Sequence, residues 1–165
     1  IGIILNSTPF FEKDKSVDVF TESLGKRRFL AKGAQSPKSK QSGKIEPTYL
    51  AEINYYLGKS FLLIKEVTIK NSFHGLRQDF NKISIACYFL SIIKNATSFN
   101  QPNPQLFRLL LHYLDYLSVE SEITKIKHQF EIDFLCLEGV HNPKIEFERA
   151  FYDYTGHIVP KPTLI

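Results

Sequence analysis

Residues 48–69, TYLAEINYYLGKSFLLIKEVTI, carry the clearest structural signal in the sequence. Alternate positions from Tyr49 to Leu57 are apolar, which is typical of a β-strand, and Gly58-Lys59 forms a two-residue turn before residues 60–69 return as a second strand. Three shorter segments of similar character precede this hairpin, at residues 1–6, 17–24 and 26–32. Five short strands with one tight hairpin predict a small closed β-barrel within residues 1–72.

From about residue 72 the apolar residues follow the 3.6-residue period of helices. The spacing predicts helices over residues 76–94, 103–117, 121–139 and 144–154. Asn103 is a good capping residue and Pro104 suits the first helical position, so the second of these helices has a clear start. The sequence therefore predicts an α+β protein, in which a barrel domain over residues 1–72 precedes a helical bundle domain over residues 73–165.

Positive charge is concentrated in one part of the chain. The 165 residues have a formal net charge of +4, but the stretch from residue 26 to residue 44 contains no acidic residue. Its basic residues are Lys26, Arg27, Arg28, Lys32, Lys38, Lys40 and Lys44. A run of this kind often serves only as a solvated surface. Here half of it lies on a predicted strand and the rest on a Gly- and Ser-rich loop, 33–43, which we predict to be flexible, and this combination suits a polyanion.

A basic surface on a small barrel predicts nucleic-acid binding. Lysine and arginine neutralise phosphates and release counterions, while aromatic rings stack on bases without regard to sequence. Phe29, on the basic strand, and Tyr56, on the expected outward face of residues 48–57, are the candidate stacking residues, although both positions also suit a core aromatic.

Sequence motifs for catalysis and for metal binding are absent. There is no phosphate-binding loop, dinucleotide fingerprint, G-x-S-x-G elbow or H-E-x-x-H helix, so we do not expect an enzyme. His128, Cys136, His141 and His157 form the one set that resembles a metal site, but their spacing matches no standard zinc finger. We therefore expect no metal and no other cofactor.

The same sequence gives expectations about location. Two cysteines fit a reducing compartment, and the apolar runs are shorter than the roughly 20 residues that cross a bilayer. No secretory leader is recognisable. We expect a cytoplasmic, nucleoid-associated protein that does not bind membranes.

Nine fragments occur in the order and spacing of one protein family. They are GIILNSTPF (2–10), EKDK (12–15), TESLGK (21–26), AKGA with KSK (31–34 and 38–40), IEP (45–47), LLIKEV (62–67), LRQD (76–79) and PNPQLF (102–107). Over roughly residues 2–110 the chain thereby resembles the bacterial recombination mediator family RecO. The resemblance implies an oligonucleotide-binding (OB) barrel followed by a helical domain.

The resemblance also implies a function in recombinational DNA repair. Members of the family bind single- and double-stranded DNA with little sequence preference, anneal complementary strands, and help to load the recombinase onto DNA coated by single-strand-binding protein. Their partners are RecR and the acidic tail of the single-strand-binding protein. By this resemblance Lys26, Arg28, Lys32, Lys38 and Lys40 hold phosphates. Arg108, Lys125 and Lys127 are candidates for binding the acidic tail, because each lies on a predicted helix.

The C-terminal half departs from the family pattern. Many relatives carry a four-cysteine zinc module in the helical domain, whereas this chain has Cys136 alone in that region, so zinc is not expected. Two other functions stay open at this point. One is an adaptor whose helical bundle binds proteins, and the other is a metal-dependent nuclease that uses scattered carboxylates.

Overall fold

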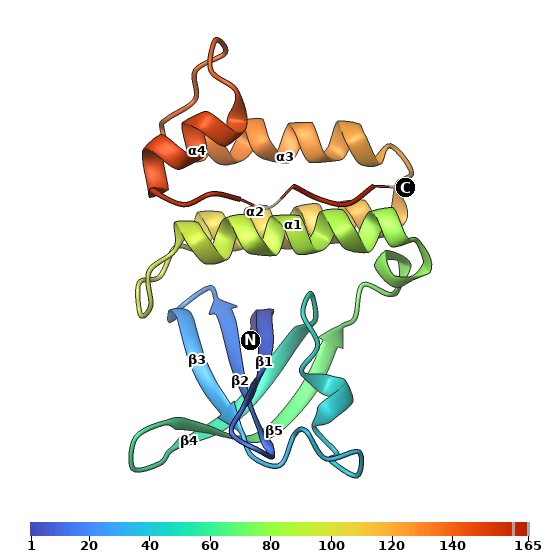
Figure 1. The fold of residues 1–165 in the computed structure, drawn as a ribbon, viewed down its shortest axis with the longest axis vertical. Coiled ribbons are helices and arrows are strands. Elements are labelled where there is room, and N and C mark those ends of the chain that lie inside the picture. The colour runs from blue at the N-terminus through green and yellow to red at the C-terminus, as the bar shows by residue number, and fades with distance from the viewer. Residues whose placement is uncertain (160, 165) are drawn as a thin grey trace. The chain divides into compact units, whose positions relative to one another are not determined.

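The computed structural model describes residues 1–159 and 161–164, and the chain divides into two compact units (Figure 1). The first unit is Ile1–Ser72 together with Ser98–Asn103, and the second is Phe73–Thr97 together with Pro104–Ile165. Residues 98–103, which the sequence places in the helical domain, therefore belong to the barrel unit.

The first unit is a closed barrel with strand order β1-β2-β3-β5-β4. Its strands are β1 (Gly2–Phe10), β2 (Asp14–Thr21), β3 (Gly25–Ala31), β4 (Leu50–Leu57) and β5 (Leu62–Asn71). The β1–β2, β2–β3 and β4–β5 pairs are antiparallel and long. Two short seams close the barrel: β1 meets β4 over two residue pairs, and β3 meets β5 in parallel over two. This is the OB fold, which confirms the predicted fold class.

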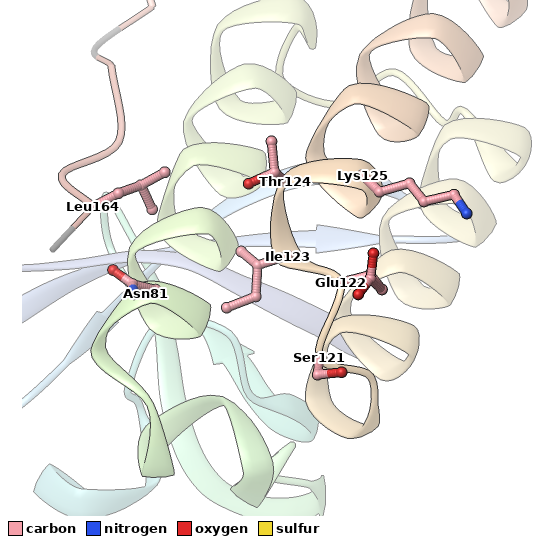
Figure 2. A pocket seen from close by; sticks show the side chains of 7 residues that line it. All are labelled: Asn81, Ser121, Glu122, Ile123, Thr124, Lys125 and Leu164. Atoms are coloured by element: carbon pink, nitrogen blue, oxygen red, sulfur yellow. The ribbon is translucent and has the colours of Figure 1, made fainter.

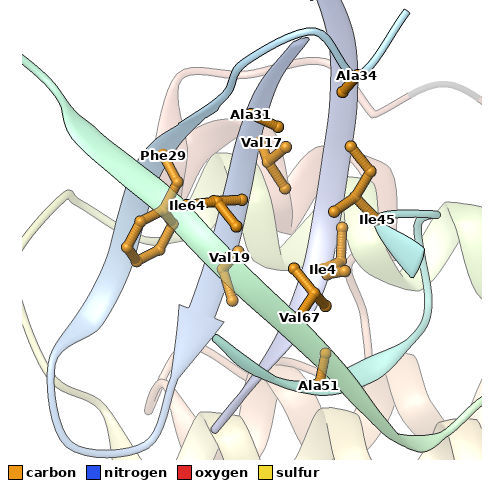
Figure 3. Close-up of a cluster of buried hydrophobic side chains, with 10 residues drawn as sticks. All are labelled: Ile4, Val17, Val19, Phe29, Ala31, Ala34, Ile45, Ala51, Ile64 and Val67. Carbon is orange, nitrogen blue, oxygen red and sulfur yellow. The ribbon is translucent and has the colours of Figure 1, made fainter. Parts of the chain in front are cut away.

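The barrel interior is filled by inward-facing side chains from every strand (Figure 3). The cluster consists of Ile4, Val17, Val19, Phe29, Ala31, Ala34, Ile45, Ala51, Ile64 and Val67. Period-two alternation explains most of it, since residues 17 and 19 on β2 and residues 29 and 31 on β3 share the inner face. Ala34 and Ile45 lie outside the strands and close the interior from the β3–β4 connection.

Some element boundaries differ from the predicted ones. β1 continues past residue 6, and Pro9 pairs with Lys15 near the strand end, where its missing N–H costs little. The first long helix begins at Phe80 because Asp79 caps it, accepting hydrogen bonds from the backbone N–H groups of Asn81 at 2.7 Å and Lys82 at 3.4 Å. Leu76 belongs instead to a short 3-10 turn before this cap.

The second unit contains four α-helices. They are α1 (Phe80–Ala96), α2 (Pro104–Val119), α3 (Ile123–Leu137) and α4 (Phe147–Thr155). The start of α2 at Pro104 is confirmed. Aromatic rings fill the interior, and the Phe89 and Phe130 rings stack with centroids 4.0 Å apart. No helix within the described ranges has the length and apolar character needed to cross a membrane.

A buried carboxylate joins α1 to α3. Glu131 accepts a hydrogen bond from the Tyr88 hydroxyl at 2.5 Å and forms an ion pair with Lys127 Nζ at 2.6 Å. Burial, and then the hydrogen bond to Glu131, raise the pKa of Tyr88 above its ordinary value of 10. In the unfolded chain this phenol ionises near pH 10, whereas in the folded chain it stays protonated.

Replacing Tyr88 by Phe tests this network. We expect Y88F to unfold about 1–2 kcal/mol more easily at neutral pH, because Glu131 loses a donor. Above about pH 10 the unfolded chain of the native protein releases the Tyr88 proton and the folded chain does not, so stability falls as the pH rises. Y88F lacks this contribution, and its urea midpoint should fall less between about pH 9 and pH 11. Y116F, which removes an exposed hydroxyl, is the control; a pH dependence equal to that of Y88F would contradict the prediction.

Candidate nucleic-acid interface

A groove of about 290 Å³ lies on the barrel between the β1–β2 turn and the β4–β5 turn. Its lining residues are Thr8, Pro9, Phe10, Ser16, Arg28, Phe29, Leu30 and Phe61. The Phe10 and Phe61 rings meet edge to face across it, with centroids 5.6 Å apart. In OB folds the face of strands 2 and 3, together with these two turns, is the surface that binds oligonucleotides.

Aromatic rings form the rim of this groove. The Phe11 side chain is 78% exposed and contacts Phe10 with ring centroids 4.4 Å apart, and Phe61 is 44% exposed. Phe11 also has a φ of 54°, in the left-handed region that non-glycine residues adopt at a cost and that clusters at functional sites. Exposed rings beside a groove offer flat faces on which bases can stack.

Phe10, Phe11 and Phe61 are not among the site residues predicted from the sequence. A signal for them exists, because two adjacent phenylalanines precede the polar turn 12–15 and a third follows the Gly58-Lys59 turn. Aromatic residues at the turns of a small barrel lie away from its interior, so the pattern points to a surface function.

Arg28 is the basic residue of β3 that reaches the surface and lines the groove. Its Nε and Nη2 atoms donate hydrogen bonds of 2.7 and 3.0 Å to the carboxylate of Asp18. Asp18 is buried, with 2% of its surface exposed. The hydrogen bond to Asp18 raises the pKa of Arg28. The guanidinium also lies over the Phe99 ring, with Cζ 4.9 Å from its centroid.

The other predicted residues of β3 are corrected by the structure. Lys26 is only 6% exposed, with Nζ 4.6 Å from the centroid of the Phe99 ring, and Phe29 is buried in the core. Arg27 is half-buried and donates from Nη1 to the Asn100 side chain. For Lys26 and Arg27 the cause is residues 98–103, which run along β3, with the Asn100 N–H bonded to the Lys26 carbonyl at 3.0 Å. Phe29 is buried because it faces the barrel interior. Lys26 is therefore covered and Arg27 is engaged by Asn100, whereas Phe29 is a core residue that also lines the groove.

The exposed lysines follow β3 in the segment from residue 32 to residue 44. They are Lys32, Lys38, Lys40 and Lys44. Hydrogen bonds attach this segment to the barrel near both of its ends, and at the C-terminal end Gln41 Nε2 donates to the Lys65 carbonyl at 3.3 Å. Gly33 N–H bonds to Asp14 Oδ1 at 2.8 Å, and Gln35 Nε2 donates to the carbonyls of Phe11 at 2.8 Å and Asp14 at 2.7 Å. The lysine segment thus begins beside the aromatic rim.

Tyr56 is exposed on β4 but does not belong to the residues that line the groove. Its neighbour Tyr55 is also exposed, and the pairing register of β4 with β5 shifts between Asn54 and Tyr55. The Tyr55 ring contacts Phe29 edge to face at 5.0 Å. Tyr56 remains a predicted stacking residue at a separate position.

The three basic residues predicted to bind a partner line three different cavities of the helical unit. Arg108 lies in a cavity of about 570 Å³ with residues of α2 and α3. Lys125 lies at one of about 430 Å³, where Figure 2 shows its side chain extending away from Leu164. Lys127 lines a third of about 440 Å³, where it is mostly buried and paired with Glu131, and its binding of a partner stays a prediction. These side chains do not form one docking site.

The four residues considered for a metal site do not converge. His128 and His141 line the cavity that contains Glu131, whereas Cys136 lines the cavity of Arg108. Among residues 1–159 and 161–164, no group of three or more His, Cys, Asp or Glu side chains is arranged to hold a metal ion. The cysteines Cys87 and Cys136 are free thiols.

Together, the closed five-stranded barrel and its aromatic and cationic groove define an OB-fold protein with a C-terminal helical unit. Two family models match this chain: the recombination protein O N-terminal model over residues 1–73 and the recombination protein O C-terminal model over residues 77–141. The chain belongs to the recombination protein O (RecO) family, which confirms the resemblance found in the sequence.

Curated relatives agree with this assignment. A protein named DNA repair protein RecO from Alkaliphilus metalliredigens (strain QYMF) is 29% identical over 140 residues, covering 84% of this chain and 57% of the relative. Proteins of the same name from Clostridium novyi (strain NT) and Streptococcus equi subsp. zooepidemicus (strain MGCS10565) are 32% and 28% identical, covering 84% and 98% of this chain and 54% and 66% of theirs. The chain spans about half the length of most of the curated relatives it matches.

Proposed function

We propose that this chain binds DNA without sequence preference and acts in recombinational DNA repair as a mediator rather than as an enzyme. The observation that carries the proposal is the barrel groove, which Phe10, Phe61 and Arg28 line, with the exposed Phe11 ring against Phe10 and a segment of exposed lysines nearby. Membership of the RecO family supports the same function, since its relatives are named DNA repair proteins.

Annealing of complementary strands follows from electrostatics and needs no catalytic residue. Two strands repel each other through their phosphates, and a cationic surface that neutralises both lowers this repulsion while base pairing supplies the driving force. Lys32, Lys38, Lys40 and Lys44 provide that charge. We further propose that the chain helps to load a recombinase onto DNA coated by single-strand-binding protein, with RecR and the acidic tail of the coating protein as partners.

A strand-annealing assay tests this function directly. Two complementary fluorescent oligonucleotides are mixed with the protein, in the presence and absence of single-strand-binding protein. We expect faster duplex formation in both conditions, with intact strands recovered in buffer containing magnesium. Unchanged annealing would contradict the proposal and favour an adaptor function, and shortened strands would show a nuclease.

Phe61→Ala tests the aromatic rim. We expect about tenfold weaker binding of a single-stranded oligonucleotide, because base stacking on an aromatic ring contributes about 1–3 kcal/mol per base. The slope of log affinity against log salt should not change, since no charge is lost. Tyr116→Ala removes an equally exposed ring from the helical unit and is the matched control; an equal loss in both variants would contradict a specific contribution of Phe61.

A further inference from the structure

Arg28 differs from the lysines near it because its counter-charge is built into the barrel. Asp18 is almost fully buried and accepts two hydrogen bonds from the Arg28 guanidinium, at 2.7 and 3.0 Å. A paired guanidinium and carboxylate carry no net charge. At the distance of a DNA phosphate, Arg28 therefore contributes much less to electrostatic attraction than an exposed lysine does.

The same contacts fix the orientation of the guanidinium. Asp18 holds its Nε–Nη2 edge, and the Phe99 ring lies on one side, 4.9 Å from Cζ. The Arg28 side chain is nevertheless 55% exposed and lines the groove that also contains Phe10 and Phe61. What stays accessible is a planar, positioned surface rather than a mobile charge. Planar guanidinium groups stack on unpaired bases, whereas an ammonium group does not.

We propose that Arg28 is a base-stacking residue for single-stranded DNA and that Asp18 is its positioning residue. The proposal rests on the proposed DNA-binding function and adds a division of labour to it. The lysine segment attracts the phosphates, and the Phe99–Arg28 stack receives a base in the groove. Because the bases of a duplex are already stacked on one another, this part of the interface selects single strands.

Oligonucleotides with and without bases test the proposal. Binding of the native protein and of R28K is measured by fluorescence anisotropy with an oligothymidylate of about 15 nucleotides and with an abasic strand of the same length and charge. We expect the native protein to prefer the thymidylate strand. R28K keeps the charge but loses the stacking plane, so this preference should shrink about tenfold while the salt slope on the thymidylate strand stays the same.

Two further variants separate position from charge. In D18N the guanidinium gains a net charge, so the salt dependence should steepen by about 0.7, the value for one phosphate contact on a single strand, and the preference for bases should fall. Lys32→Ala is the matched control: it should make the salt dependence shallower by about 0.7 and leave the preference for bases unchanged. Thermal unfolding shows whether each variant is folded. If D18N does not fold, R28K and Lys32→Ala alone still test the proposal.

The outcomes are distinct. If R28K keeps the full preference for bases, Arg28 acts as a point charge and the proposal is overturned. If the native protein binds neither strand, the proposed DNA-binding function itself fails. If it binds both strands equally while annealing still occurs, DNA binding stands and base stacking by Arg28 does not.

Discussion

Replacing Lys32, Lys38 and Lys40 together by glutamate is expected to weaken binding of single-stranded DNA about a hundredfold at about 50 mM salt. The three side chains are exposed on the segment 32–44, which Gln35 attaches to the barrel by a hydrogen bond to the Phe11 carbonyl. Each phosphate contact on a single strand contributes about 0.7 to the slope of log affinity against log salt, so the slope should fall by about 2. Anisotropy titrations at several salt concentrations measure both quantities.

A second triple variant separates local charge from net charge. Lys125, Lys144 and Lys161 are exposed in the helical unit, and their replacement by glutamate changes the net charge of the chain by the same amount. We expect this control to keep most of the affinity and the original slope. Equal losses in the two triple variants would mean that overall charge, rather than the lysine segment, determines binding.

Gly25→Ala is expected to lower the free energy of unfolding by about 3 kcal/mol or more. Gly25 has a φ of 70°, and a Cβ there would lie 2.2 Å from the backbone oxygen of Gln101. Because the obstacle is backbone, residues 98–103 must move away from β3. The hydrogen bond from Asn100 to Lys26 and the Phe99 contact with Arg28 should be lost with this movement. Urea unfolding measures the stability, and amide exchange at Asn100 reports the displacement.

Gly139→Ala provides the comparison. Gly139 has a φ of 71°, almost the same as Gly25, but nothing lies within 4 Å of a Cβ built there. Its replacement introduces backbone strain without a collision and should cost only about 1 kcal/mol. The difference between the two variants therefore measures the packing of residues 98–103 on the barrel. Similar losses would contradict that packing.

The strands and helices follow from local patterns, and these are visible in the sequence. The alternation in residues 48–69 predicts β4 and β5, and Asn103-Pro104 predicts the start of α2. The boundaries that differ depend on individual caps such as Asp79, which accepts hydrogen bonds only once the helix has formed. The OB strand order also follows, because five short strands of this spacing have few ways to close.

The site was only partly predictable, since accessibility is a property of distant contacts. Alternation places Lys26 and Arg28 on one face of β3, and both do lie beside Phe99. Nothing local to β3 indicates that Phe99, about seventy residues later, covers that face. Phe29 illustrates a different difficulty. An aromatic residue on a basic strand can either fill the core or stack on a ligand, and in the structure Phe29 packs in the barrel core.

The two short seams have a consequence for how the barrel folds. The β1–β2–β3 meander and the β4–β5 hairpin are each held by many pairings between residues close in sequence. Two residue pairs join β3 to β5, and two residue pairs together with the hydrogen bonds between Ile4 and residues 48–49 join β1 to β4. Local contacts form quickly and distant ones slowly, so we expect ring closure to be the last event in folding and the first to reverse. Phe29 and Leu30 belong both to the β3–β5 seam and to the floor of the groove. An oligonucleotide bound in the groove would contact both sides of the β3–β5 seam. We therefore expect bound DNA to slow the opening of the barrel.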